Sequence, residues 1–157
     1  VAGRGTDEVK SNDVTGRYKR GEVGFGIEMG RPGTGTIFRQ VEQMTMALAK
    51  IGVQFERKNP LTTLLSNPKT GGIRKDILDE RVLTAIIEFK VSIERVREVL
   101  ETLRTAEKAL DTVFSLDYIS RPDFDGNLPA VEEAKRLGYE PSKHVKICAG
   151  LGRPKID

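Results

Sequence analysis

The chain has 157 residues and carries 26 Lys and Arg against 23 Asp and Glu, with one His, one Cys and no Trp. This length suits one domain with a buried core. A single Cys excludes an internal disulfide, and one Cys with one His excludes a typical structural zinc site. No apolar stretch approaches the roughly 20 residues that a membrane-spanning helix needs, and the N-terminal residues lack the apolar core of a secretory signal. We therefore expect a cytoplasmic protein without membrane contact.

Residues 1–20 combine three glycines with many polar and few apolar side chains. This composition is typical of a flexible arm that buries little surface. From residue 21 to residue 157, apolar side chains recur at helix and strand spacings, and no repeat or low-complexity tract divides the segment. We expect a single α+β domain over 21–157, preceded by the arm.

The first predicted element is a strand from Glu22 to Met29. Its apolar side chains alternate with Gly24, Gly26 and Glu28, which is the period of a half-buried strand. Glycine weakens a strand, so two glycines on the face away from the core suggest a bulge or the close approach of another backbone or a ligand.

A helix is predicted after the glycine-rich turn that follows this strand. An apolar stripe at alternating steps of four and three residues covers 37–51. Thr34 or Thr36 is placed to cap the start of the helix, and Gly52 is placed to end it. A short strand over 53–56 follows.

The next segment, 59–74, is a long connection interrupted by prolines and glycines, and 76–82 is predicted to form a short helix. The connection carries three leucines that are not expected in a fully solvated loop: Leu61, Leu64 and Leu65. Either they tuck under the loop or they meet another subunit. Together with the open edges expected of a sheet, they suggest a homo-oligomer.

The segment 84–93 fits two patterns. Its apolar residues alternate with polar ones as in a strand, and they also continue the heptad spacing of one long helix. We favour the strand, because β-branched residues are frequent and Ser92 suits the cap of a helix that begins at Glu94. The remaining chain predicts a strand, a turn, a helix ended by Gly138 and a last strand, over 113–119, 121–127, 129–137 and 145–149.

In order, the core elements are strand, helix, strand, strand, helix and strand. This succession resembles the ferredoxin-like split βαβ plait over residues 22–119, with a C-terminal helix and strand appended. The resemblance is one of architecture. Because no family motif accompanies it, it implies no activity and no cofactor.

The strongest local feature is the run from Gly30 to Thr36, between the first strand and the first helix. A helix start offers free amide hydrogens and partial positive charge, and glycines let an anion approach them. The candidate ligand-binding residues are Arg31, Gly33, Thr34, Gly35, Thr36 and Arg39. The run matches neither a Walker loop nor a dinucleotide fingerprint, and a turn that needs glycine for backbone reasons alone also explains it. We hypothesise a site here for a small phosphorylated or carboxylated metabolite or nucleotide.

Two further residues extend this hypothesis. The tripeptide that contains Arg31 recurs around Arg153, which would join the same site if the C-terminal tail folds back; a solvated tail is the alternative. If the protein is an enzyme acting on such a metabolite, Glu28 is the candidate general base. No metal site is predicted, because the oxygens of Asp123 and Asp125 fit an ordinary turn and lack the distal Glu of a calcium loop.

A third functional class rests on charge. The segment 57–75 contains five basic residues and no acidic one, so it is a candidate surface for RNA or for an acidic protein. A solvated basic loop is the simpler interpretation.

Overall fold

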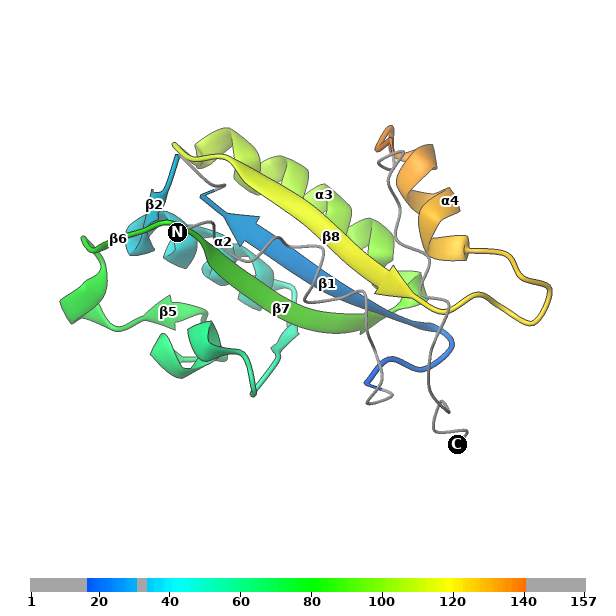
Figure 1. Ribbon diagram of the computed structural model, residues 1–157, viewed down its shortest axis with the longest axis horizontal. Coiled ribbons are helices and arrows are strands. Elements are labelled where there is room, and N and C mark those ends of the chain that lie inside the picture. Colours follow the sequence, from blue (N-terminus) through cyan, green and yellow to red (C-terminus); the bar gives the residue numbers. More distant parts are fainter. Residues whose placement is uncertain (1–16, 31–33, 141–157) are drawn as a thin grey trace.

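The computed structural model describes residues 17–30 and 34–140 and has an α+β fold (Figure 1). Its main sheet is antiparallel, with the strand order β3-β7-β1-β8. The strands of this sheet are β1 (Glu22–Met29), β3 (Gln54–Phe55), β7 (Ala85–Ser92) and β8 (Phe114–Ser120). The α-helices among these residues are α2 (Phe38–Lys50), α3 (Val96–Ala106) and α4 (Pro129–Arg136).

Shorter elements connect the larger ones. Two small ladders pair β2 (Thr36–Ile37) with β6 (Arg81–Val82), and β4 (Leu65–Asn67) with β5 (Gly72–Ile73). The 3-10 turns are η1 (Pro60–Leu64), η2 (Lys75–Ile77), η3 (Ile93–Arg95) and η4 (Glu107–Ala109). The ladder of β2 and β6 is the one that shapes the candidate site.

β1 is a central strand, and both of its faces are buried, whereas its alternating sequence predicts a half-buried strand. It pairs with β7 along its full length and with β8 over seven residues. The side chains of one face are fully buried: Val23, Phe25, Ile27 and Met29. The ring of Phe25 stacks on that of Phe89 in β7, with centroids 5.3 Å apart. The predicted strand Glu22–Met29 is confirmed.

Helices α2 and α3 cover one face of the sheet, and α4 packs against α3 (Figure 1). The predicted apolar stripe of the first helix is confirmed, because Val41, Met44 and Leu48 have no exposed surface. Gly52 follows the helix with a φ of 72°, a left-handed conformation that favours glycine. Strand and helix periods in the sequence therefore place the core correctly.

The glycine face of β1 holds an aromatic ring. A Cβ atom at Gly24 would lie 2.2 Å from Cε1 of Tyr18, a residue that is itself buried. The close approach expected from the glycines is thus made by a side chain of the same chain. Register with both neighbouring strands runs through Gly24 and Gly26 without a bulge.

The segment 84–93 is a strand, as favoured above. Ala85–Ser92 pairs with all eight residues of β1, and Ile87, Phe89 and Val91 are buried. Pairing with β1 decides between the two patterns. The ladder to β1 satisfies backbone amides and carbonyls that a helix would have to satisfy within itself. Ser92 stands before the 3-10 turn η3 but makes no capping hydrogen bond to the helix backbone.

Two predictions near α2 are wrong. Neither Thr34 nor Thr36 caps the helix, since its N-cap is Ile37 and no side chain caps it. The short helix predicted over 76–82 is instead the turn η2 followed by the strand β6. Both errors have one cause, because the segment 78–80 supplies the carbonyls that bind the first amides of α2.

The leucines of the long connection tuck under it. Leu61 and Leu65 are buried, Leu64 is half-buried, and all three join the core of the chain. They therefore give no support to a subunit interface, and a homo-oligomer stays a prediction that rests on the sheet edges alone. The strands, turn and helix predicted over 113–137 are present, with Gly138 at a φ of 78°.

Some predicted features lie outside the described residues. These are residues 1–16 of the arm predicted over 1–20, the strand over 145–149, and the candidate ligands Arg31, Gly33 and Arg153. Residues 17–20 are described, and Tyr18 among them is buried, which a flexible arm does not predict.

Candidate functional site

The glycines of the predicted loop are required by the backbone. Gly30 and Gly35 have φ values of 71° and 69°. A Cβ atom at Gly30 would lie 2.6 Å from the carbonyl carbon of Gly35, so the two ends of the loop are packed together. The amide of Gly30 also donates a 2.8 Å hydrogen bond to the carbonyl of Val113. These contacts fix Gly30 and Gly35, the described residues on either side of 31–33, against each other and against Val113.

The first amides of α2 are occupied. The amide of Phe38 donates to the carbonyl of Glu80 at 3.1 Å, and that of Arg39 donates to the carbonyl of Leu78 at 2.8 Å. Protein carbonyls thus hold the hydrogens that were expected to meet an anion. These two backbone groups are unavailable to a ligand.

Arg39 is also engaged within the chain. Its Nε and Nη2 atoms both donate to Oδ1 of Asp79, at 3.1 and 2.6 Å. The pair is exposed and binds the start of α2 to the segment that leads into β6. Arg39 therefore positions this segment and does not face a ligand as a free cation.

A cavity of about 250 Å³ nevertheless lies beside this loop. It is enclosed by the end of the loop, the first turn of α2, β6 and the segment before β8. Its lining includes the predicted Thr34, Gly35 and Thr36, together with four residues that the sequence did not suggest: Gln40, Arg81, Asp111 and Thr112. Three of the predicted site residues are thus brought together at one cavity.

The sequence carried a signal for one of these additional residues. Gln40 stands four positions after Thr36, so helical spacing places both on one side of the helix start. Arg81 comes to the cavity because β6 pairs with β2, where Ile37 is opposite Arg81. Asp111 and Thr112 belong to the connection between α3 and β8. No local pattern in the sequence links these last three positions to the loop.

The cavity contains donors whose hydrogen-bonding capacity is little used. The hydroxyl of Thr36 is 3.5 Å from the carbonyl of Ile37, and that of Thr112 is 3.5 Å from the carbonyl of Gly35, which are long hydrogen bonds. Gln40 uses Oε1 to accept the amide hydrogen of Asp111 at 2.8 Å. That bond leaves the Nε2 hydrogens of Gln40 without a partner among the described residues.

Glu28, the candidate general base, does not line this cavity. It is 3 % exposed and lies on the face of β1 away from the helices, opposite Ser115 of β8. The hydroxyl of Ser115 lies 3.5 Å from its Oε2. The structure therefore does not place Glu28 at the cavity that Thr34, Gly35 and Thr36 line.

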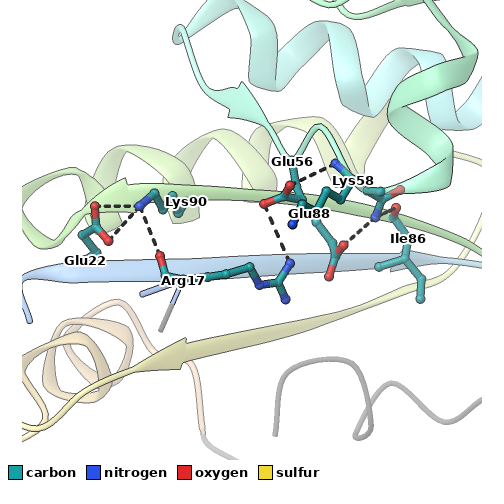
Figure 2. Close-up of polar contacts among 8 residues, drawn as sticks. Arg17, Glu22, Glu56, Lys58, Ile86, Glu88 and Lys90 are labelled. Atoms are coloured by element: carbon teal, nitrogen blue, oxygen red, sulfur yellow. Dashed lines mark hydrogen bonds and ion pairs between the residues drawn. The ribbon is translucent and has the colours of Figure 1, made fainter. Parts of the chain in front are cut away.

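The same face of the sheet carries paired charges (Figure 2). Lys90 donates to both carboxylate oxygens of Glu22 at 2.9 Å and to the carbonyl of Arg17 at 3.2 Å. The guanidinium of Arg17 lies 3.8 Å from Glu56. Burial raises the pKa of Glu22, but hydrogen bonds from the Lys19 amide and from Lys90 outweigh it, and the pKa is lowered from 4.5.

Next to this row, Asn59 holds a buried carboxylate. Its Nδ2 donates to Oε2 of Glu88 at 2.7 Å and to the carbonyl of Ile86 at 3.0 Å, and its Oδ1 accepts from the amide of Leu61. Asn59 and Glu88 are 6 % and 7 % exposed. The group fixes the start of η1 against β7, which is a structural role.

The basic residues of 57–75 are all exposed. Arg74 pairs with Asp76 through two hydrogen bonds, and this pairing raises the pKa of Arg74. The charged side-chain groups of the other four, Arg57, Lys58, Lys69 and Lys75, pair with no carboxylate among the described residues, although the backbone amide of Lys58 donates to Glu56. An exposed basic loop is thus present, and nothing in its geometry selects a partner.

No known protein family, curated protein or solved structure matches this chain. Across residues 17–30 and 34–140, none of the helices has the length and apolar character needed to traverse a bilayer. The same residues contain no cluster of three His, Cys, Asp or Glu side chains that would hold a metal ion.

Proposed function

We propose that this protein binds a small metabolite with an anionic group in the cavity beside the Gly30–Ile37 loop. The observation that carries the proposal is the guanidinium of Arg81, which lines the cavity and has no carboxylate partner among the described residues. A free guanidinium is a strong and geometrically specific donor for carboxylate or phosphate.

The hydrogen-bond donors at this cavity differ from those that the sequence predicts. Arg81 takes the role first given to Arg39, which is paired with Asp79. The hydroxyls of Thr36 and Thr112 and the amide of Gln40 replace the backbone amides at the helix start. A ligand oxygen bound by these side chains would leave the backbone hydrogen bonds of α2 intact and would replace only the two long hydroxyl bonds of Thr36 and Thr112.

The size of the cavity limits the ligand. Sites for drug-sized molecules begin at roughly 300 Å³, whereas this cavity has a volume of about 250 Å³. A metabolite with few heavy atoms fits this description better than a nucleotide does.

Calorimetric titration of the full chain with acetate, phosphate and small carboxylic acids tests the proposal. We expect at least one of them to bind, and the substitution Arg81→Met to weaken binding by about tenfold or more, because a charge-assisted hydrogen bond is lost. The matched control is Arg57→Met, which removes an unpaired exposed arginine in the basic loop. No binding by any of these anions, or equal binding by the Arg81→Met variant, would overturn the proposal.

The fold can also be named more finely. The order β3-β7-β1-β8 places β7 between the strands joined by α2, and β1 between the strands joined by α3. Two interleaved crossovers of this kind support a ferredoxin-like plait, with α4 appended after β8. An experimentally determined structure in which β8 paired elsewhere than with β1 would contradict it.

Binding of a small anion is favoured over catalysis and over binding of RNA or protein. Catalysis through Glu28 has no support from the cavity, which this residue does not line. RNA or protein binding by 57–75 has the support of charge and exposure alone. Both, like the cytoplasmic location, stay predictions.

A further inference from the structure

We infer that the ligand of this cavity is a zwitterion, specifically a small α-amino acid. The inference rests on the proposed function, because it assigns the same cavity a ligand class. The observation behind it is a second charge: the carboxylate of Asp111 lines the cavity together with the guanidinium of Arg81.

The two charges do not neutralise one another. No ion pair within 4.0 Å joins Arg81 to Asp111, or either residue to any other charged group in the described part of the chain. Opposite charges that line one small cavity without contact attract a molecule that carries both signs. A simple anion would meet Arg81 favourably and Asp111 unfavourably.

Both charges are attached to backbone that is held in place. Arg81 lies in β6, which pairs with β2, and the residues before it are bound to α2 by the amides of Phe38 and Arg39. The amide of Asp111 is bound by the side chain of Gln40. The fold therefore fixes the backbone positions of both residues, so that a ligand has only their side chains to order.

An α-amino acid meets these requirements with few atoms. Its carboxylate accepts two hydrogen bonds from a guanidinium, and its ammonium group, one carbon away, donates to a carboxylate. The hydroxyls of Thr36 and Thr112 can donate to the other carboxylate lone pairs in exchange for their long bonds to backbone carbonyls. The whole zwitterion is small enough for a cavity of about 250 Å³.

The test compares ligands that differ by one charge. The full chain is titrated in a calorimeter with alanine, propionate, ethylamine and phosphate, and with a panel of the common amino acids. We expect an amino acid to bind about tenfold or more tightly than the carboxylate of the same carbon skeleton, because the second charged hydrogen bond is lost in the latter.

Variants assign the two charges. Asp111→Asn is expected to abolish the preference for the amino acid over the carboxylate, whereas Arg81→Met abolishes binding of both. The matched control Asp125→Asn removes an exposed carboxylate from a distant turn and is expected to change neither affinity. Thermal unfolding of each variant checks that the fold is kept, which the exposure of Arg81 and Asp111 favours.

The outcomes separate the two claims. One result would contradict the amino-acid ligand but keep the anion site. In it, propionate or phosphate binds as tightly as alanine and every other amino acid, and Asp111→Asn strengthens that binding. If no titrant binds, or if the Arg81→Met variant binds as tightly as the wild type, both the site and its ligand class are overturned.

Discussion

Arg39 donates two hydrogen bonds to Oδ1 of Asp79, at 3.1 and 2.6 Å, and so joins the first turn of α2 to the segment that leads into β6. Arg81 begins β6 two residues later. The arginine that the sequence offers as a ligand therefore helps to place the arginine that lines the cavity.

This relationship predicts different effects for the two arginines. Arg39→Met is expected to change the affinity for a small carboxylate by about threefold or less, because an exposed ion pair contributes little. Arg81→Met is expected to weaken it by about tenfold or more. Calorimetry on both variants measures the contrast. Equal losses would show that Arg39 contacts the ligand directly.

A second prediction concerns the packing of Gly71 against α2. A Cβ atom at Gly71 would lie 2.3 Å from the carbonyl oxygen of Thr45, and its φ is 76°. Gly71→Ala is expected to lower the free energy of unfolding by about 3 kcal/mol or more, since backbone must move. Gly52→Ala is the matched control, because it has a φ of 72° with nothing within 4 Å. It is expected to cost about 1 kcal/mol. Chemical denaturation measures both, and similar losses would contradict the packing argument.

A third prediction concerns the buried amide of Asn59. Asn59→Ala leaves the Glu88 carboxylate and the Leu61 amide without the partners they have now. We expect a loss of about 3 kcal/mol of unfolding free energy, because buried polar groups are left unsatisfied. Asn67→Ala removes an exposed asparagine that accepts only the amide of Lys69 with its side chain, and we expect about 1 kcal/mol. If Asn59→Ala lowers the free energy of unfolding no more than Asn67→Ala does, the buried amide of Asn59 does not have this role.

A fourth prediction concerns pH. The pKa of Glu22 is lowered from 4.5 in the folded protein by hydrogen bonds from Lys19 and Lys90. Its carboxylate therefore stabilises the fold above the ordinary pKa, and this contribution is lost as pH falls through the folded-state pKa. Wild type is expected to exceed Glu22→Gln in stability by up to about 1 kcal/mol near neutral pH, because the pair is partly exposed.

Urea denaturation of the two proteins at about pH 7 and about pH 3 measures this difference. The gap is expected to close at the lower pH. A gap that stayed constant would show that the Glu22 side chain contributes by packing and not by charge.

The elements predicted correctly are those in which the spacing of apolar residues shows which face packs against the core. β1 alternates every second residue, and α2 repeats its stripe at steps of three and four. Burial of an apolar face is a local property of the pattern, so Phe25 and Met44 can be assigned to the core before their contacts are known. The choice of a strand for Ala85–Ser92 had another basis, its β-branched residues and the cap expected at Ser92, because its apolar spacing fits both a strand and a helix.

The elements predicted wrongly are those that depend on a distant segment. Residues 78–82 do not form a helix, because the carbonyls of Leu78 and Glu80 accept amide hydrogens of α2. In addition, β6 pairs with β2. Thr36 enters that ladder and so cannot cap the helix. Similarly, the glycines of β1 indicated a close neighbour, but only the folded chain shows that it is the ring of Tyr18.

The sequence by itself determined where the chain turns before α2, and placed Thr34, Gly35 and Thr36 at that turn. Only the tertiary structure decided which charges stand beside them. Arg81 and Asp111 are separated by the whole of β7 and α3 along the chain. They line one cavity because strand pairing and a single side-chain hydrogen bond act across space, and neither interaction leaves a period in the sequence.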